Sequence, residues 1–348
     1  MLFHHLHFYV NDASFWRRWF IRKLAFKLGP TYQHITSVRQ GHIEIRLSSP
    51  KQTTAAKQYL QSHPAGIADI AFATAQFDSL LQRCLSQGAT LLQPPTRQAN
   101  GLRHCQIKGW AHLRHTLVEV PLSRLSAANN ANQQPLETCW LSSIDHVVIN
   151  VAKGALTAAA SWYQKMFGLV PGQQFEIQTA RSGLRSQVLK HPHSPLQLPI
   201  NEPTSNNSQI QEFLDHNRGS GVQHVALRSH DAIGAIARFR QQGLPLLNVP
   251  DTYYDQLTER PNCPLQDVSA IRKQQLLLDW LPGGQQGMLL QTFTQPIFPE
   301  PTFFFEIIER SRYQDKRQLK TAQGFGEGNF QALFEAIERS QLERGCPR

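Results

Sequence analysis

The chain has 348 residues, of which 41% are hydrophobic and 17% are charged, which is enough apolar material for two domains with their own cores. There is no long low-complexity tract, which argues against a mostly disordered chain, and no run of about 18 apolar residues that would span a membrane. The start lacks the layout of a secretory signal, and the five scattered cysteines form no CxxC pair. We therefore expect a cytoplasmic protein with reduced thiols.

The first distinctive segment, residues 16–23, is basic and aromatic, in a chain whose net charge is +10. Trp16, Phe20 and Leu24 recur at helical spacing, which predicts an amphipathic helix with a buried apolar side and a basic side in water. The same composition is compatible with binding to nucleic acid or to an anionic membrane surface, the less favoured interpretation. We predict neither partner.

Two parts of the chain resemble each other, which predicts two related halves. Residues 66–72 align with residues 221–227, and the same register continues to Pro95 and Pro250. Residues 7–11 resemble residues 146–150 in a different register, so the second half needs an additional loop, which we place within residues 191–208. The predicted domains are residues 1–125, without a metal site, and residues 141–348, the catalytic domain, joined by a polar linker at 126–140.

Each half is predicted to contain two copies of a smaller unit. In the clearest copy, a strand at 221–228 precedes a helix that is capped by Asp231 and ended by Gly243. Strands follow at 275–281, 288–293 and 302–310, which makes the unit βαβββ. The residues from 144 begin another copy, with a helix that ends at Gly168. Four units predict an α+β fold of two open barrels of curved mixed sheet, with a packed C-terminal helix at 328–345.

The repeat also indicates where a metal site lies. His224 aligns with Asp69, whereas His146 aligns with His7, so only the second half retains both histidines. Glu306 interrupts an apolar strand, where a carboxylate is costly to bury unless a cation or hydrogen bonds compensate. Two imidazoles and one carboxylate form the facial triad of Fe(II) oxygenases. Spacing alone is a weak signal among 15 histidines, and histidines that are only hydrogen-bonded in the core are an open alternative.

Seven motifs in residues 144–345 resemble the 4-hydroxyphenylpyruvate dioxygenase family, which belongs to the vicinal-oxygen-chelate superfamily of paired βαβββ modules. The motifs are IDHVV at 144–148, LPINEP at 198–203, SQIQEF at 208–213, GVQHVAL at 221–227, LLQTFT at 289–294, FEIIER at 305–310 and GFGEGNF at 324–330. The first half resembles the family's N-terminal domain more in placement than in residues.

The resemblance implies one Fe(II) per chain, held by His146, His224 and Glu306, and no catalytic side-chain nucleophile. It implies a polar pocket for the substrate, formed by Ser186, Asn201, Gln209, Gln223 and Gln291. It also implies apolar walls and a lid formed by Pro199, Phe293, Phe304, Phe325 and Phe330.

Several of these residues have other interpretations. Asn201 is compatible with a turn, Gln209 with a helix surface, and the phenylalanines with ordinary core positions. Ideal strand alternation would point Gln223 away from the face of His224. Glycines at 324, 326 and 328 suit a flexible lid. The sequence departs from the family at residues 311–323, an insertion beside the expected lid.

The implied reaction uses 4-hydroxyphenylpyruvate and O2 and yields homogentisate and CO2, in a homodimer or homotetramer. Whether homogentisate serves tyrosine breakdown or tocopherol and quinone synthesis is left open. A 4-hydroxymandelate synthase, with the same metal and substrate but benzylic hydroxylation, is the nearest alternative. A metal-free protein that binds a small aromatic ligand, and a nucleic-acid binder, are more distant alternatives.

Overall fold

The computed structural model describes residues 1–97, 101–131, 139–178, 183–280, 287–315 and 318–329. The first half contains one eight-stranded mixed sheet in the order β2-β3-β4-β1-β5-β8-β7-β6. Its strands are β1 (Leu2–Tyr9), β2 (Lys27–Leu28), β3 (Thr36–Gln40), β4 (Ile43–Ser48), β5 (Gly66–Thr74), β6 (Leu91–Arg97), β7 (Arg103–Lys108) and β8 (Arg114–Glu119). Its helices are α1 (Ala13–Leu24), α2 (Thr54–Ser62), α3 (Phe77–Ser86) and α4 (Leu122–Ala131).

The second half repeats this sheet in the equivalent order β10-β11-β12-β9-β13-β16-β15-β14. Its strands are β9 (Ser143–Asn150), β10 (Val170–Gln178), β11 (Gly183–Lys190), β12 (Gln197–Pro203), β13 (Gly221–Ser229), β14 (Leu277–Trp280), β15 (Met288–Phe293) and β16 (Phe304–Arg310). Its helices are α5 (Leu156–Phe167), α6 (Gln209–Asn217), α7 (Ala232–Gln241), α8 (Asp251–Glu259) and α9 (Ser269–Gln274).

Four βαβββ units build the two sheets, which confirms the predicted architecture. Within each unit the first strand pairs in parallel with the last, as β9 does with β12 and β13 with β16. The first strands of the two units in a half then pair antiparallel, as β1 does with β5 and β9 with β13. The helix boundaries expected around α7 are also confirmed, because Asp231 accepts a hydrogen bond from the backbone of Gly234 and Gly243 has a positive φ.

Matching β-bulges fix the register of the two halves. In the second half, Asp145 and Gln223 are the residues skipped in the pairing of β9 with β13, which sets Ala226 opposite His146. The first half skips His4 and Ala68 in the same way, and sets Ala71 opposite His5. The structural counterpart of His146 is therefore His5, and the alignment with His7 was wrong by two residues.

The added length of the second half lies mainly in a long hairpin rather than in a loop. β10 has nine residues where its counterpart β2 has two, and β11 has eight where β3 has five. Residues 191–208, the predicted position of the extra loop, instead contain the turn between β11 and β12, the strand β12 and the approach to α6. The turn between β11 and β12 is four residues longer than its counterpart between β3 and β4, so part of the added length is found where the loop was predicted.

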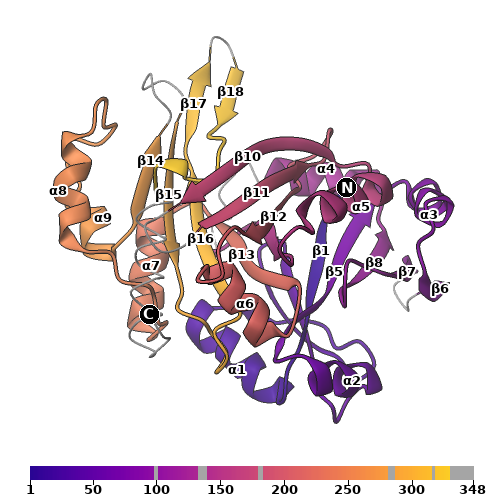
Figure 1. Cartoon of the computed structure of the whole chain (residues 1–348). Helices are drawn as coiled ribbons and strands as arrows, with labels where there is room; N and C mark the ends of the chain where they lie inside the picture. The colour runs from indigo at the N-terminus through magenta and orange to yellow at the C-terminus, as the bar shows by residue number, and fades with distance from the viewer. Residues whose placement is uncertain (98–100, 132–138, 179–182, 281–286, 316–317, 330–348) are drawn as a thin grey trace.

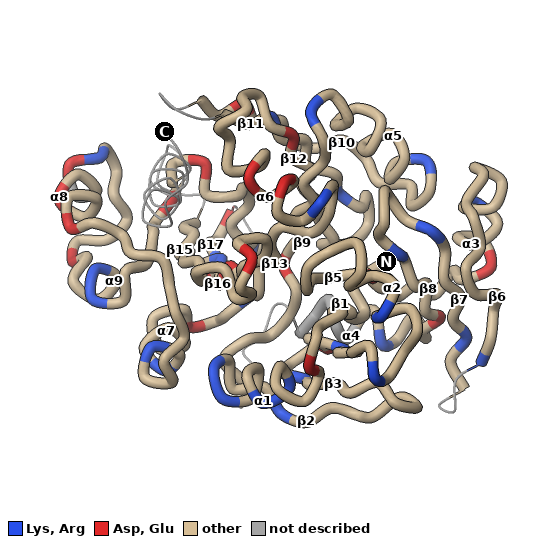
Figure 2. The backbone as a smooth tube through the Cα atoms, turned by 60° about the horizontal axis from the view of Figure 1, so that its bottom comes forward, with Lys and Arg blue, Asp and Glu red and all other residues tan. Residues whose placement is uncertain are grey.

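The two halves share one apolar core. Phe8 of β1 packs its ring edge-on against Phe303, with centroids 5.1 Å apart, and Phe20 of α1 contacts Phe305. Helix α1 buries Trp16, Phe20 and Leu24 as predicted, and its Lys and Arg residues are visible along the tube in Figure 2. The halves lie directly against each other, with the indigo and purple first half to the right of and below the second (Figure 1).

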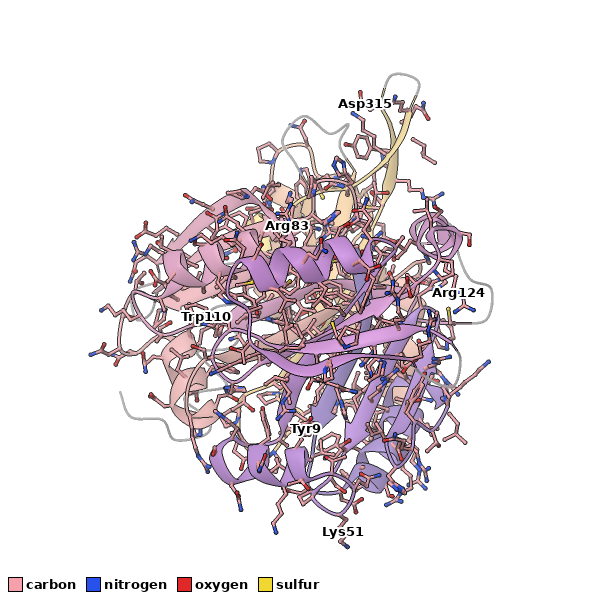
Figure 3. The ribbon with its side chains drawn as sticks, turned by 90° about the vertical axis from the view of Figure 1, so that its right-hand side faces the viewer. Tyr9, Lys51, Arg83, Trp110, Arg124 and Asp315 are labelled. Atoms are coloured by element: carbon pink, nitrogen blue, oxygen red, sulfur yellow. The ribbon has the colours of Figure 1, made fainter. Side chains whose placement is uncertain are left out.

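The insertion near the C-terminal end contains secondary structure that was not predicted from the sequence. The insertion at 311–323 forms a two-stranded hairpin, β17 (Arg312–Asp315) with β18 (Gln318–Thr321), which projects from the body of the protein near Asp315 (Figure 3). A short 3-10 helix, η1 (Glu327–Asn329), follows, and the predicted terminal helix with Phe330 lies outside the described residues.

The first part of the predicted linker, up to Ala131, belongs to α4. None of the described helices is both long and apolar enough to cross a membrane.

Candidate metal centre and its pocket

Three adjacent strands bring His146, His224 and Glu306 together. β9, β13 and β16 are neighbours in the sheet, and Ala226 of β13 lies opposite both His146 and Glu306. Glu306 Oε2 is 3.2 Å from His146 Nε2 and 3.7 Å from His224 Nε2. One ligand atom from each of the three residues lies within 4.8 Å of the others. Among the described residues, this is the one group of three or more His, Cys, Asp and Glu side chains with such a geometry.

The first histidine is held by a buried carboxylate. Asp145, the bulged residue before it, approaches His146 Nδ1 with Oδ1 at 2.9 Å. Burial alone would raise the pKa of Asp145, but Arg310 and Arg228 outweigh it and hold that pKa well below its ordinary value. Asp145 is therefore an anion that accepts a hydrogen bond from Nδ1–H of His146 and leaves Nε2 directed at the cluster, as is common for metal-bound histidines.

The second histidine is held in the same way by a neutral side chain. Gln223, the other bulged residue, lies with Oε1 3.2 Å from His224 Nδ1. The ring of His224 stacks on Phe304 with centroids 4.8 Å apart, and burial keeps its pKa well below the ordinary value. Because the bulge interrupts ideal alternation, Gln223 and His224 both line the same cavity, contrary to the expectation from strand periodicity.

The donor set suits a divalent transition metal. Burial lowers the pKa of His146, but the negative charge of Glu306 and the hydrogen bonds to Asp145 and Glu306 raise it to about 9. The surroundings of His146 therefore stabilise positive charge, and a metal ion that binds there would displace the proton. Two imidazole nitrogens and one carboxylate oxygen on one side of an ion match the 2-His-1-carboxylate pattern of non-haem Fe(II) sites.

The three candidate ligand residues are part of the lining of a cavity with mainly apolar walls. It is lined by side chains of both units of the second half: His146, Val148, Phe175, Ile177, Leu184, Ser186, Val188, Pro199, Asn201, Gln209, Ile210, Gln223, His224, Phe293, Phe304, Glu306 and Phe325. Four of the five polar residues expected to bind substrate are in this lining. So are the expected wall residues, apart from Phe330, which lies outside the described residues.

Gln291, the fifth of the expected substrate-binding residues, contacts a candidate metal ligand and the backbone of Phe325. It is not among the residues that line the cavity. Its Nε2 donates to Glu306 Oε1 at 2.9 Å and to the backbone oxygen of Phe325 at 3.1 Å, and it is 2% exposed. Gln291 therefore fixes the orientation of the Glu306 carboxylate through Oε1.

Part of the cavity wall was not identified from the sequence. Phe175 and Ile177 of β10 and Leu184 of β11 come from the long hairpin that the first half lacks. Their signal is the alternation of apolar residues at 175 and 177, within a stretch that lies before the predicted position of the extra loop. Arg310 was also not identified as a site residue. The feature that could have indicated it is a charged side chain at the end of a mainly apolar strand.

The chain is similar to known proteins over most of its length. The model of the glyoxalase/bleomycin resistance protein/dioxygenase superfamily matches residues 2–110 and 143–260. An uncharacterized protein of Synechocystis sp. is 35% identical, with all of both chains covered. The 4-hydroxyphenylpyruvate dioxygenase of Legionella pneumophila is 33% identical over 90% of this chain and 86% of its own. That of Danio rerio is 32% identical over 99% and 91%.

Among solved structures, a mutant of 4-hydroxymandelate synthase from Streptomyces coelicolor superposes with a TM-score of 0.81 at 25% identity. The match covers 98% of this chain and 100% of that one.

Proposed function

The chain belongs to the glyoxalase/bleomycin resistance protein/dioxygenase superfamily and, within it, to the 4-hydroxyphenylpyruvate dioxygenase family, and we propose that it converts 4-hydroxyphenylpyruvate and O2 to homogentisate and CO2. The observation that carries this proposal is the cluster of His146, His224 and Glu306 in the lining of a cavity with mainly apolar walls and four further polar side chains, Ser186, Asn201, Gln209 and Gln223. Such a cavity suits an aromatic ring with a charged oxo-acid group at one end.

The metal would be held by Nε2 of both histidines and by the carboxylate of Glu306, one Fe(II) per chain. Three protein ligands on one side leave coordination positions for the oxo-acid group and for O2. When bound, the iron supplies the activation of O2 and the electron transfer that amino-acid side chains cannot provide. Every other task belongs to the side chains around it, and none of them acts as a nucleophile.

The polar side chains of the cavity would orient the substrate. Ser186, Asn201 and Gln209 are 6–8% exposed and offer hydroxyl and amide groups for the carboxylate and the phenol. Gln223 is already engaged with His224 through Oε1, which leaves its amide N–H groups for an anionic oxygen of the substrate. For Gln291 we propose a positioning role on Glu306 in place of the substrate contact expected from the sequence.

The aromatic walls would keep water away from the reacting groups. Phe325 lies edge-on against His146, with centroids 5.1 Å apart, and Phe304 covers one face of His224. Phe293 and Pro199 complete the apolar lining. Exclusion of water protects a strongly oxidising centre from side reactions and strengthens the polar contacts made inside.

The direct test is product identification after anaerobic loading with Fe(II) and addition of 4-hydroxyphenylpyruvate and O2. We expect O2 uptake with release of homogentisate and CO2, and loss of both in Glu306→Ala. Absence of O2 uptake by a chain that has bound iron would refute the substrate assignment.

One alternative has a specific observation in its favour. The structural similarity to a 4-hydroxymandelate synthase covers nearly the whole chain. Release of 4-hydroxymandelate in the same assay would assign that reaction to the same site. A chain that binds the aromatic acid tightly but no metal would instead support the metal-free binding protein.

Two further features stay predictions. We propose a homodimer or homotetramer, which light scattering on the purified protein checks, and a cytoplasmic location, which cell fractionation checks.

A further inference from the structure

Arg310, at the end of β16, contacts two functional parts of the molecule at once. Its Nε and Nη2 donate to the two oxygens of Asp145 at 2.8 and 2.7 Å, in a bidentate pair. Its Nη1 donates to the backbone oxygens of Ala322 and Gly324 at 3.2 and 2.8 Å. The guanidinium side chain is only 2% exposed, so these contacts are shielded from water. One side chain thus joins the partner of His146 to the segment at 322–329.

This segment, residues 322–329, covers the metal centre, and we call it the cover segment. Phe325 lines the cavity and packs against His146. Gly326 has a φ of 77°, and a Cβ there would overlap the amide of Gln291, so the backbone lies directly on that side chain. Gln291 in turn bonds both Glu306 and the backbone oxygen of Phe325. A metal ligand is therefore tied to the cover segment on this side as well.

Arg228 provides an internal contrast. It also bonds Asp145, with Nε and Nη2 at 3.0 and 2.6 Å from Oδ2. No hydrogen bond links it to the cover segment among the described residues. Both arginines neutralise the same buried carboxylate, but only Arg310 extends from it to Ala322 and Gly324.

We propose that Arg310 is a positioning residue that couples the order of the cover segment to metal binding at His146. Asp145 can hold the Nδ1 proton of His146 in place only while its own oxygens are fixed, and Arg310 fixes them both. The same guanidinium holds the carbonyls of Ala322 and Gly324 while the cover segment is closed. Metal binding and closure therefore favour each other, and the coupling acts in both directions. This inference rests on the metal centre of the proposed function.

The test uses hydrogen exchange and metal affinity rather than activity, with Co(II) as the probe. In the wild-type chain we expect Co(II) to slow exchange of the backbone amides in residues 322–329. In Arg310→Lys, which keeps the charge but loses the planar fork, we expect that slowing to disappear and the dissociation constant for Co(II) to rise about 10–100-fold. In Arg228→Lys, the matched control, we expect a weaker metal site in which Co(II) still slows exchange by the wild-type factor.

Two results would overturn the inference while leaving the proposed metal centre in place. One is unchanged exchange of residues 322–329 when Co(II) binds the wild-type chain, a measurement that needs no variant. The other is an Arg310→Lys chain, or Arg310→Gln if the first does not fold, that keeps the wild-type slowing. If Co(II) fails to bind the wild-type chain at all, the metal centre itself is refuted and the inference falls with it.

Discussion

The two halves have the same strand order and the same bulges, but only the second places metal ligands at the equivalent positions. His146, His224 and Glu306 correspond to His5, Asp69 and Thr116 in the first half, because Asp69 pairs with Arg114 as His224 pairs with Phe304. Even the partner of the first histidine is repeated, since the bulged His4 lies 2.8 Å from His5, Nδ1 to Nδ1. The scaffold is therefore common to both halves, and the side chains decide which one can bind a metal.

The first half satisfies its buried carboxylate internally. Asp69 accepts hydrogen bonds from the backbone and hydroxyl of Thr116 and from Gln106, at 2.9 Å in the case of the Gln106 amide. Arg46, which is buried, occupies the position that Pro199 has in the second half. Burial lowers the pKa of His5, and the positive charge of Arg46 lowers it further. A carboxylate whose acceptors are occupied, beside a buried cation, is a poor ligand. The short β2–β3 hairpin also leaves out the wall that β10 and β11 supply.

The largest effect should come from removing a metal ligand, compared with the same change at its counterpart in the first half. Glu306→Ala removes a ligand, so we expect turnover of 4-hydroxyphenylpyruvate to fall to the background without enzyme. Its counterpart Thr116→Ala should keep the wild-type rate in the same assay. Equal losses in both variants would mean that the first half also takes part in the reaction.

A core substitution tests whether the halves fold as one unit. Phe305 is fully buried and contacts Phe8, Phe20 and Phe303, so Phe305→Ala should lower the free energy of unfolding by about 3–5 kcal/mol. Because the contacts with Phe8 and Phe20 cross between the halves, we expect a single shifted transition in chemical denaturation. Two separate transitions would show that the halves are energetically independent.

A smaller effect should distinguish Asp145, the bulged residue before His146, from His4, the bulged residue before His5. Asp145→Asn leaves His146 without an anionic partner, and we expect metal affinity to fall about 10–100-fold in a Co(II) titration. His4→Ala, at the same position of the first half, should leave metal affinity at the wild-type value. A loss of affinity in His4→Ala would imply a contribution from the first half.

The smallest effect should be alike in both halves. Asp12 caps α1 and Asp231 caps α7 through the same bond to the backbone N–H three residues on. Replacement of either by Ala should cost about 1 kcal/mol of stability by thermal unfolding, without loss of metal. A large loss of bound metal in Asp231→Ala alone would show that the cap also supports the site.

The sequence predicted the repeated units and the three candidate ligands because both depend on short patterns within single strands. It misplaced the counterpart of His146 by two residues because β1 carries histidines at both 5 and 7, and a shift of two residues leaves every side chain of a strand on the same face. A bulge explains why Gln223 lines the cavity against the rule of alternation. Gln291 was assigned to the substrate pocket because its contacts with Glu306 and the cover segment depend on tertiary structure.

We propose that the second half alone holds one metal ion, at His146, His224 and Glu306. The most direct test of this claim is the metal content of the purified chain after anaerobic loading with Fe(II) and removal of free metal. We expect about one iron per chain in the wild type and in Thr116→Ala, and none retained in Glu306→Ala. Iron retained by Glu306→Ala at the wild-type level, or lost in Thr116→Ala, would contradict the claim.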